Sequence, residues 1–161
     1  MNIALACDHR GFDIKQSLLD QLRKEGHGVE DFGTLESKAC DYPDFAVPAA
    51  LAVVRGKAQL AILLDGSGIG MSIVANKIPG IRAAICHDEL TAEISRRYNN
   101  ANVLCLAVDL LGGELIRRIV TVWLKSPFED GRHARRVEKI GELERRLFPD
   151  IQQTLNNLKP E

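Results

Sequence analysis

Residues 63–77 read LLDGSGIGMSIVANK, and this stretch decides the fold. The apolar run that it ends predicts a buried strand over 59–64, and the pattern after the glycines predicts a helix over 68–78. Gly66, Gly68 and Gly70 let the backbone turn tightly and leave amide N–H groups exposed at the start of the helix, which favours an anion. A single carboxylate, Asp65, lies between the strand and the glycines, and its role has to be explained.

The rest of the chain alternates strands and helices in the same way. The predicted strands are 2–7, 28–33, 59–64, 81–86 and 102–107, and the helices between them are roughly 11–26, 42–55, 68–78, 88–99 and 111–125. Four of the strands are almost wholly apolar, which indicates a sheet covered on both faces. Helix-length connections indicate parallel strands joined by right-handed crossovers. The pattern therefore predicts a doubly wound α/β domain.

The C-terminal segment, 131–161, has a different pattern. Val137, Ile140, Leu143 and Leu147 recur at helical spacing among charged residues, which predicts an amphipathic helix with no strand after it. Such an arm either packs back on its own domain or reaches across a partner subunit. A dimer is one expectation that follows.

Composition limits the possible functions. The 161 residues, 45 % hydrophobic and 27 % charged, suffice for one domain, and a net charge of −1 provides no overall field for nucleic acid or an anionic membrane. We find no apolar run of the ~20 residues that a membrane span needs, and no signal-peptide pattern, so we expect a cytosolic protein. The four cysteines form no C-x-x-C pair, which suits reduced thiols and argues against structural zinc.

Polar residues follow three of the predicted strands. Asp8-His9 follows the first, Asp65-Gly66-Ser67-Gly68 the third and His87-Asp88 the fourth. Ligands of open parallel sheets bind at the carboxyl ends of the strands, so we expect these three loops to converge on one crevice. The alternative for the aspartates is helix capping, which we favour for Asp88.

Asp65 has two interpretations. As a base it would take a proton from a carbon next to a carbonyl, while the loop amides stabilise the enediolate. As a structural residue it would cap the helix over 68–78. The loop itself is neither a dinucleotide fingerprint, which needs a glycine at Met71, nor a P-loop, which needs Lys-Ser or Lys-Thr after a glycine.

Arg132 and Arg136 lie four residues apart on the predicted C-terminal helix, with His133 next to the first. Paired guanidinium groups match phosphate oxygens well. The alternative is a solvated stripe on the helix surface.

Five blocks of the sequence together carry a resemblance. They are ACDHRGF (6–12), DYPDFA (41–46), LLDGSGIGMSIVANKIPGIRAA (63–84), SRRYNNANVL (95–104) and GRHARRVEKI (131–140). In this order and spacing they resemble the type B ribose-5-phosphate isomerases, a family that also contains the galactose-6-phosphate isomerase subunits.

The resemblance implies a Rossmann-like three-layer αβα sandwich with a five-stranded parallel sheet and a C-terminal helix exchanged at a dimer interface. It implies a homodimer or tetramer, with each active site between one subunit's strand ends and its partner's C-terminal arginines, and neither a metal nor an organic cofactor. The candidate catalytic residues are then Asp65, Ser67, Tyr98 and Asp8. The candidate substrate-binding residues are His9, Gly66, Gly68, Gly70, Asn99, Arg132, His133 and Arg136.

Three positions depart from the pattern of the family. Where most similar proteins have a proton-shuttling cysteine, this chain has Asp65; where they have a ring-opening histidine, it has Tyr98; and where they often place a phosphate-binding arginine, it has Asp109. A carboxylate can serve as the base, a phenol is a poorer proton relay at neutral pH, and an aspartate would repel phosphate if it points the same way. His133 or Asp8 are alternatives for ring opening.

The expected function is isomerisation of a small phosphorylated sugar through a cis-enediol, with ribose 5-phosphate as the leading substrate. Galactose 6-phosphate and tetrose phosphates are alternative substrates; a tetrose phosphate forms no stable ring and needs no ring-opening group. Two other classes stay open: a non-catalytic subunit that needs a paralogous partner, and a nucleotide-binding module of the flavodoxin or dinucleotide type.

Overall fold

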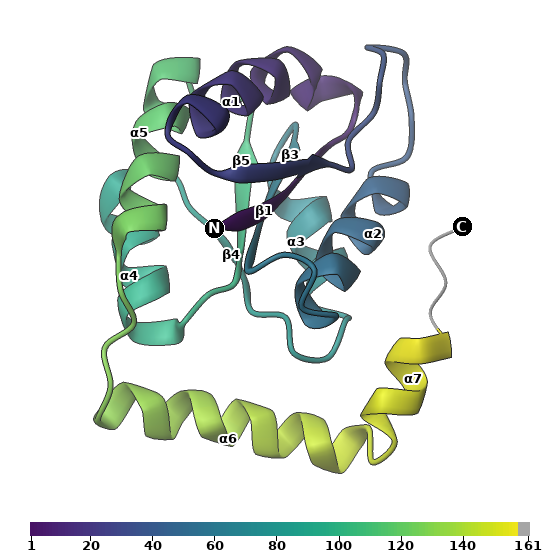
Figure 1. Ribbon diagram of the computed structural model, residues 1–161, viewed down its shortest axis with the longest axis vertical. Helices are drawn as coiled ribbons and strands as arrows, with labels where there is room; N and C mark the ends of the chain where they lie inside the picture. The colour runs from purple at the N-terminus through teal and green to yellow at the C-terminus, as the bar shows by residue number, and fades with distance from the viewer. Residues whose placement is uncertain (158–161) are drawn as a thin grey trace.

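A computed structural model describes residues 1–157 as a parallel sheet between helices (Figure 1). The elements are β1 (Asn2–Cys7), η1 (His9–Gly11), α1 (Phe12–Lys24), β2 (Gly28–Asp31), α2 (Pro43–Val54), β3 (Leu60–Asp65), α3 (Ile69–Ala75), β4 (Ala83–Ile85), α4 (Glu89–Asn99), β5 (Val103–Ala107), α5 (Gly113–Lys125), α6 (Arg132–Leu147) and α7 (Ile151–Asn157). The predicted α/β fold with five parallel strands is confirmed.

The strand order is β2-β1-β3-β5-β4, with every neighbouring pair parallel. Side chains of α1, α4 and α5 form one core with one face of the sheet, and side chains of α2 and α3 form a second core on the other face. Strands covered on both faces have to be apolar throughout, and β3 and β5 are buried along their whole length. The sheet therefore exposes polar groups mainly at its two ends.

The edge strand β4 is protected by a side chain. The Asn76 amide donates to the Ala83 carbonyl (3.0 Å) and accepts from the Ala83 N–H (2.9 Å). An unpaired strand edge is a template for pairing with another chain. Asn76 satisfies the outward-facing peptide groups at this point, so a second copy cannot extend the sheet there without displacing Asn76.

The C-terminal segment differs from the prediction of one helix over 131–161. It forms two helices, α6 and α7, because Pro149 lacks an N–H and disfavours a helical conformation at Phe148 (φ −128°, ψ 73°). Glu144 of α6 accepts from the Gly80 N–H (3.1 Å), and Leu155 of α7 is buried against the second core. In one chain the segment thus packs on its own domain; residues 158–161 of the predicted arm lie outside the described residues.

Lys15 is fully buried beneath the loop that follows β2. Its Nζ donates to the Asp31 carboxylate (2.8 Å) and to the Thr34 carbonyl (2.7 Å). Because Asp31 keeps some solvent access, we expect Lys15→Met to lower the free energy of unfolding by about 2 kcal/mol rather than the larger cost of a fully buried pair. Urea denaturation would measure this change against Lys24→Met, an exposed control. Equal losses in the two variants would contradict it.

Candidate active site

Asp65 is the last residue of β3 and is only 4 % exposed. Its carboxylate accepts hydrogen bonds from the Gly68 N–H and from the Met71 N–H (3.3 Å), so it caps the start of α3. Burial raises the pKa of the Asp65 carboxyl, an effect that these amides oppose and the charge of Asp8 reinforces. The N-cap residue of α3 is Gly68 rather than Asp65, but the Asp65 carboxylate satisfies two amides at the helix start as a cap would. Its raised pKa also suits a base.

Two positions of the loop require glycine. Gly68 has φ +76°, a left-handed conformation that favours glycine, and a Cβ on Gly70 would lie 2.7 Å from the Tyr42 ring. The Gly68 amide, one of those expected to stabilise an enediolate, already bonds Asp65, as does the Met71 amide. In the described part of the chain, the N–H groups of Gly66 and Ser67 have no acceptor. They are the donors still available to a ligand.

The β1 exit lies beside the β3 exit, as expected from the sequence. Asp8 is 6 % exposed, and its N–H donates to the carbonyl of Leu64 (3.2 Å). The Cys40 N–H donates to Nδ1 of His9 (3.3 Å). Neutral imidazole has one donor and one acceptor nitrogen, so His9 in this tautomer presents Nε2–H as a donor.

The third loop of the crevice is not the one predicted. Because β5 lies between β3 and β4, the loop after β5 borders the Asp65 loop: the Asp109 N–H donates to the Gly66 carbonyl (3.1 Å). The loop with His87 and Asp88 lies one strand further away. Asp88 accepts from the Thr91 N–H (2.7 Å) in a capping box at the start of α4, which confirms its predicted role as a cap.

Asp109 is not an isolated negative charge. The Arg10 guanidinium binds it with two nitrogens, Nε (3.0 Å) and Nη2 (2.7 Å). The repulsive effect expected of Asp109 is therefore compensated within the chain. Nothing in the local sequence pattern indicates Arg10 as a site residue, because its partner lies 99 residues away.

The other candidate residues form a second group at the end of α4 and the start of α6. The rings of Tyr98 and His133 are stacked with centroids 4.4 Å apart, and Nε of Arg132 donates to Nε2 of His133 (3.2 Å). His133 is 6 % exposed, whereas Arg132, Arg136 and Asn99 are exposed. One face of α6 thus presents two guanidinium groups beside a buried histidine.

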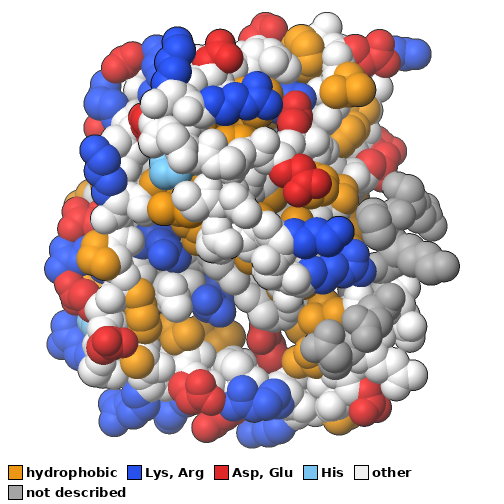
Figure 2. All heavy atoms as spheres, in the orientation of Figure 1, with side chains coloured by type: hydrophobic (Ala, Val, Ile, Leu, Met, Phe, Trp, Pro, Cys, Tyr) orange, Lys and Arg blue, Asp and Glu red, His pale blue; other side chains and the backbone are white. Residues whose placement is uncertain are grey.

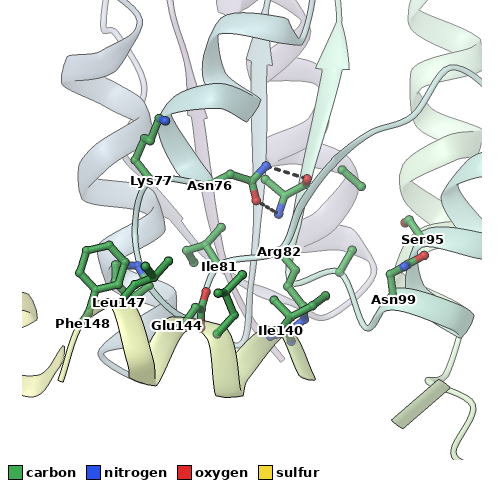
Figure 3. Close-up of a pocket in the computed structure, with 15 residues that line it drawn as sticks. Asn76, Lys77, Ile81, Arg82, Ser95, Asn99, Ile140, Glu144, Leu147 and Phe148 are labelled. Carbon is green, nitrogen blue, oxygen red and sulfur yellow. Dashed lines mark hydrogen bonds between the residues drawn. The ribbon is translucent and has the colours of Figure 1, made fainter. Parts of the chain in front are cut away.

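One chain does not bring the two groups together. The helix α4 begins after the carboxyl end of β4 and returns to the amino end of β5, so Tyr98 and Asn99 lie at the opposite end of the sheet from Asp65. At that end a pocket of about 570 Å³ separates α6 from the sheet (Figure 3). It is lined by Asn99, Arg82 and the apolar side chains Ile140, Leu143, Leu147 and Phe148.

This end of the molecule has an apolar surface. Figure 2 shows hydrophobic side chains in the hollow above α6, and Lys and Arg mixed with Asp and Glu along the outer edge of that helix. Ile140, Leu143 and Leu147 are 43 %, 47 % and 63 % exposed in the single chain. Across residues 1–157, no helix combines the length and the apolar character that crossing a membrane would require.

Comparison with known proteins identifies the family. The model of the ribose/galactose isomerases matches residues 3–140. The chain belongs to the ribose/galactose isomerase family. It is 44 % identical over 144 residues to ribose-5-phosphate isomerase B of Escherichia coli, a match that covers 89 % of this chain and 97 % of the relative.

Two further proteins are similar to this chain along most of their length. A D-erythrulose-4-phosphate isomerase of Pectobacterium atrosepticum is 44 % identical, with 88 % of this chain and 93 % of the relative covered. The structure of ribose-5-phosphate isomerase B from Clostridium thermocellum superposes with a TM-score of 0.89 at 46 % identity, over 91 % of this chain and 99 % of that one. Membership in this family makes the chain an aldose–ketose isomerase of sugar phosphates.

Proposed function

We propose that the chain interconverts D-ribose 5-phosphate and D-ribulose 5-phosphate through a cis-enediol, with Asp65 as the base. The observation that carries the proposal is a buried carboxylate with a raised pKa beside two amides that have no described acceptor in residues 1–157. Asp65 takes the proton from the carbon next to the carbonyl and returns it to the neighbouring carbon, so the substrate gains and loses no electrons.

In this mechanism the N–H groups of Gly66 and Ser67 bind the oxygen on which negative charge develops. The Ser67 hydroxyl accepts from the Ile69 N–H (3.2 Å), which leaves its own proton able to reach a substrate oxygen. Ser67 is thus our candidate for moving the hydroxyl proton between the two oxygens. Asp8 and the Nε2–H of His9 bind sugar hydroxyls at the neighbouring strand exit.

We propose that the second group of residues reaches the crevice from another copy of the chain. Supporting this, the two groups lie at opposite ends of one subunit, and the apolar face of α6 is exposed enough to bury against a partner. Arg132 and Arg136 would hold the phosphate, His133 would support them, and Tyr98 and Asn99 would bind the open sugar. The functional unit is then a homodimer or a tetramer built from such dimers.

A tetrose phosphate is the second candidate substrate. Tyr98 stands where a ring-opening histidine is expected, and a relative at 44 % identity is a D-erythrulose-4-phosphate isomerase. A tetrose phosphorylated at its terminal oxygen cannot close a five-membered ring, so it needs no ring-opening acid. We also propose a cytosolic location, since the four cysteines are all free thiols.

Proton NMR in deuterated buffer tests the function with three substrates: ribose 5-phosphate, D-erythrulose 4-phosphate and galactose 6-phosphate. We expect ribulose 5-phosphate to form and deuterium to enter at the carbon next to the carbonyl. Turnover of erythrulose phosphate alone would favour the second candidate. If the purified protein turns over none of the three, the alternative of a subunit that needs a paralogous partner replaces our proposal.

A further inference from the structure

The Arg10 side chain crosses the mouth of the crevice. Arg10 follows β1 and Asp109 follows β5, while the exit of β3 lies between them. Their contact has three hydrogen bonds: Nε donates to both carboxylate oxygens (3.2 and 3.0 Å) and Nη2 donates to one (2.7 Å). The pair passes directly over Gly66, because a Cβ there would lie 2.7 Å from Oδ2 of Asp109.

The crevice has an excess of negative charge, so a cation beside it would favour binding of an anionic substrate. The carboxylates of Asp8, Asp65 and Asp109 come from three adjacent strand exits, and the first two are buried. A sugar phosphate brings nearly two further negative charges at neutral pH. Like charges that approach in a partly desolvated site repel strongly. The guanidinium of Arg10 binds Asp109 at this end of the sheet and can offset part of that repulsion.

The geometry leaves part of Arg10 available to a ligand. A guanidinium carries five N–H donors, and Asp109 engages only Nε and one terminal nitrogen. Among residues 1–157, no described acceptor binds Nη1, and the side chain is 54 % exposed. Its outer edge, formed by both terminal nitrogens, has the spacing that binds two phosphate oxygens.

We propose that Arg10 is a phosphate-binding residue of the active site and that Asp109 is the positioning residue that aims it. The inference rests on the proposed function, because it assumes a phosphorylated sugar in this crevice. Asp109 holds one edge of the guanidinium fork and fixes its plane, which lowers the entropy lost when the other edge binds phosphate. Arg10 then acts from the subunit that carries Asp65, on the opposite side of the substrate from Arg132 and Arg136.

The chain offers a matched control for an ordinary surface ion pair. Arg118 binds Glu89 (2.7 Å) with exposed fractions of 53 % and 38 %, close to the 54 % and 40 % of Arg10 and Asp109. A surface pair of this kind contributes little to stability and has no reason to affect phosphate. The two arginines therefore differ mainly in their place relative to the crevice.

The test measures KM and kcat for ribose 5-phosphate and, separately, the Kd of inorganic phosphate by calorimetry at fixed ionic strength. We expect Arg10→Gln to raise both KM and Kd about tenfold, the loss of one charge-assisted contact, with kcat changed less than about twofold. Asp109→Asn keeps the guanidinium but loosens it, so both constants should rise about threefold. Arg118→Gln should leave all three unchanged.

Equal phosphate affinity in wild type, Arg10→Gln and Arg118→Gln would overturn the assignment of Arg10, whatever the activity. An unchanged affinity in Asp109→Asn beside a weakened Arg10→Gln would overturn the positioning role alone. If wild type turns over no sugar phosphate, the proposed function fails, and the phosphate titration still decides whether Arg10 binds the anion. No measurable binding of phosphate by wild type would also count against the assignment.

Discussion

Asp65→Asn is expected to lower kcat for sugar-phosphate isomerisation by about 10³-fold, within the range for the loss of a general base. The asparagine fills the same space and its carbonyl oxygen can still accept the Gly68 N–H, but it cannot take a proton from carbon. Deuterium uptake at the carbon next to the carbonyl should disappear together with product formation. Proton NMR measures both, and Asp20→Asn, at an exposed position, is the control.

A second variant separates chemistry from capping. Asp65→Cys places the base that the resemblance associates with this position, and we expect it to keep measurable activity. A base must be deprotonated, so activity is lost as the pH falls through its pKa. In wild type that loss should occur above the ordinary range of an aspartate, because burial raises the pKa of Asp65. In the cysteine variant it should move to a higher pH than in wild type, because the ordinary thiol pKa of about 8.5 is itself higher and the same burial raises it further.

A purely structural Asp65 would behave differently. In that case wild type and Asp65→Cys would lose activity over the same pH range. Asp65→Asn would be less stable but would keep deuterium uptake. Full activity of a stably folded Asp65→Asn would exclude the carboxylate as the base. The cap and the base are compatible roles, since each carboxylate oxygen has two lone pairs and the two described amide bonds occupy one on each.

The sequence predicted the layers of the fold better than the assembly of the site. Apolar strands alternating with helices require a covered parallel sheet, and that pattern is local. The order of the strands depends on contacts between residues far apart in the sequence. For this reason His87 was expected beside Asp65, whereas the structure has Asp109 there. The contact between Arg10 and Asp109 depends on the same order and had no signal in the sequence.

Two other features do have a signal in the sequence. Phe148-Pro149 predicts a helix boundary, because proline disfavours a helical conformation in the residue before it. The place of Tyr98 and Asn99 also follows from topology: a helix between two parallel strands runs antiparallel to them, so its last residues lie at their amino ends. Asp65, at a carboxyl end, cannot share a crevice with them inside one chain.

Because Asp65 and α6 lie at opposite ends of one subunit, we expect activity to be recovered when two defective variants are mixed. Asp65→Asn lacks the base, and Arg132→Gln/Arg136→Gln lacks the phosphate-binding pair on α6. If each site combines Asp65 of one subunit with α6 of another, a mixed dimer contains one intact site and one doubly defective site. Random pairing of equal amounts makes half of the dimers mixed, so activity should return to about a quarter of wild type.

The matched control mixes Asp65→Asn with Asp8→Asn, whose defects fall in the same half of the site. A mixed dimer of these two has one defect in each site, so no activity should return. Mixing after reversible unfolding, with a tag on one variant, measures the fraction of mixed dimers directly. Recovery in both mixtures, or in neither despite verified mixed dimers, would contradict a site shared between subunits. For a site within one subunit, α6 would have to move toward Asp65 of its own chain, which would break the contact of Glu144 with the Gly80 N–H (3.1 Å).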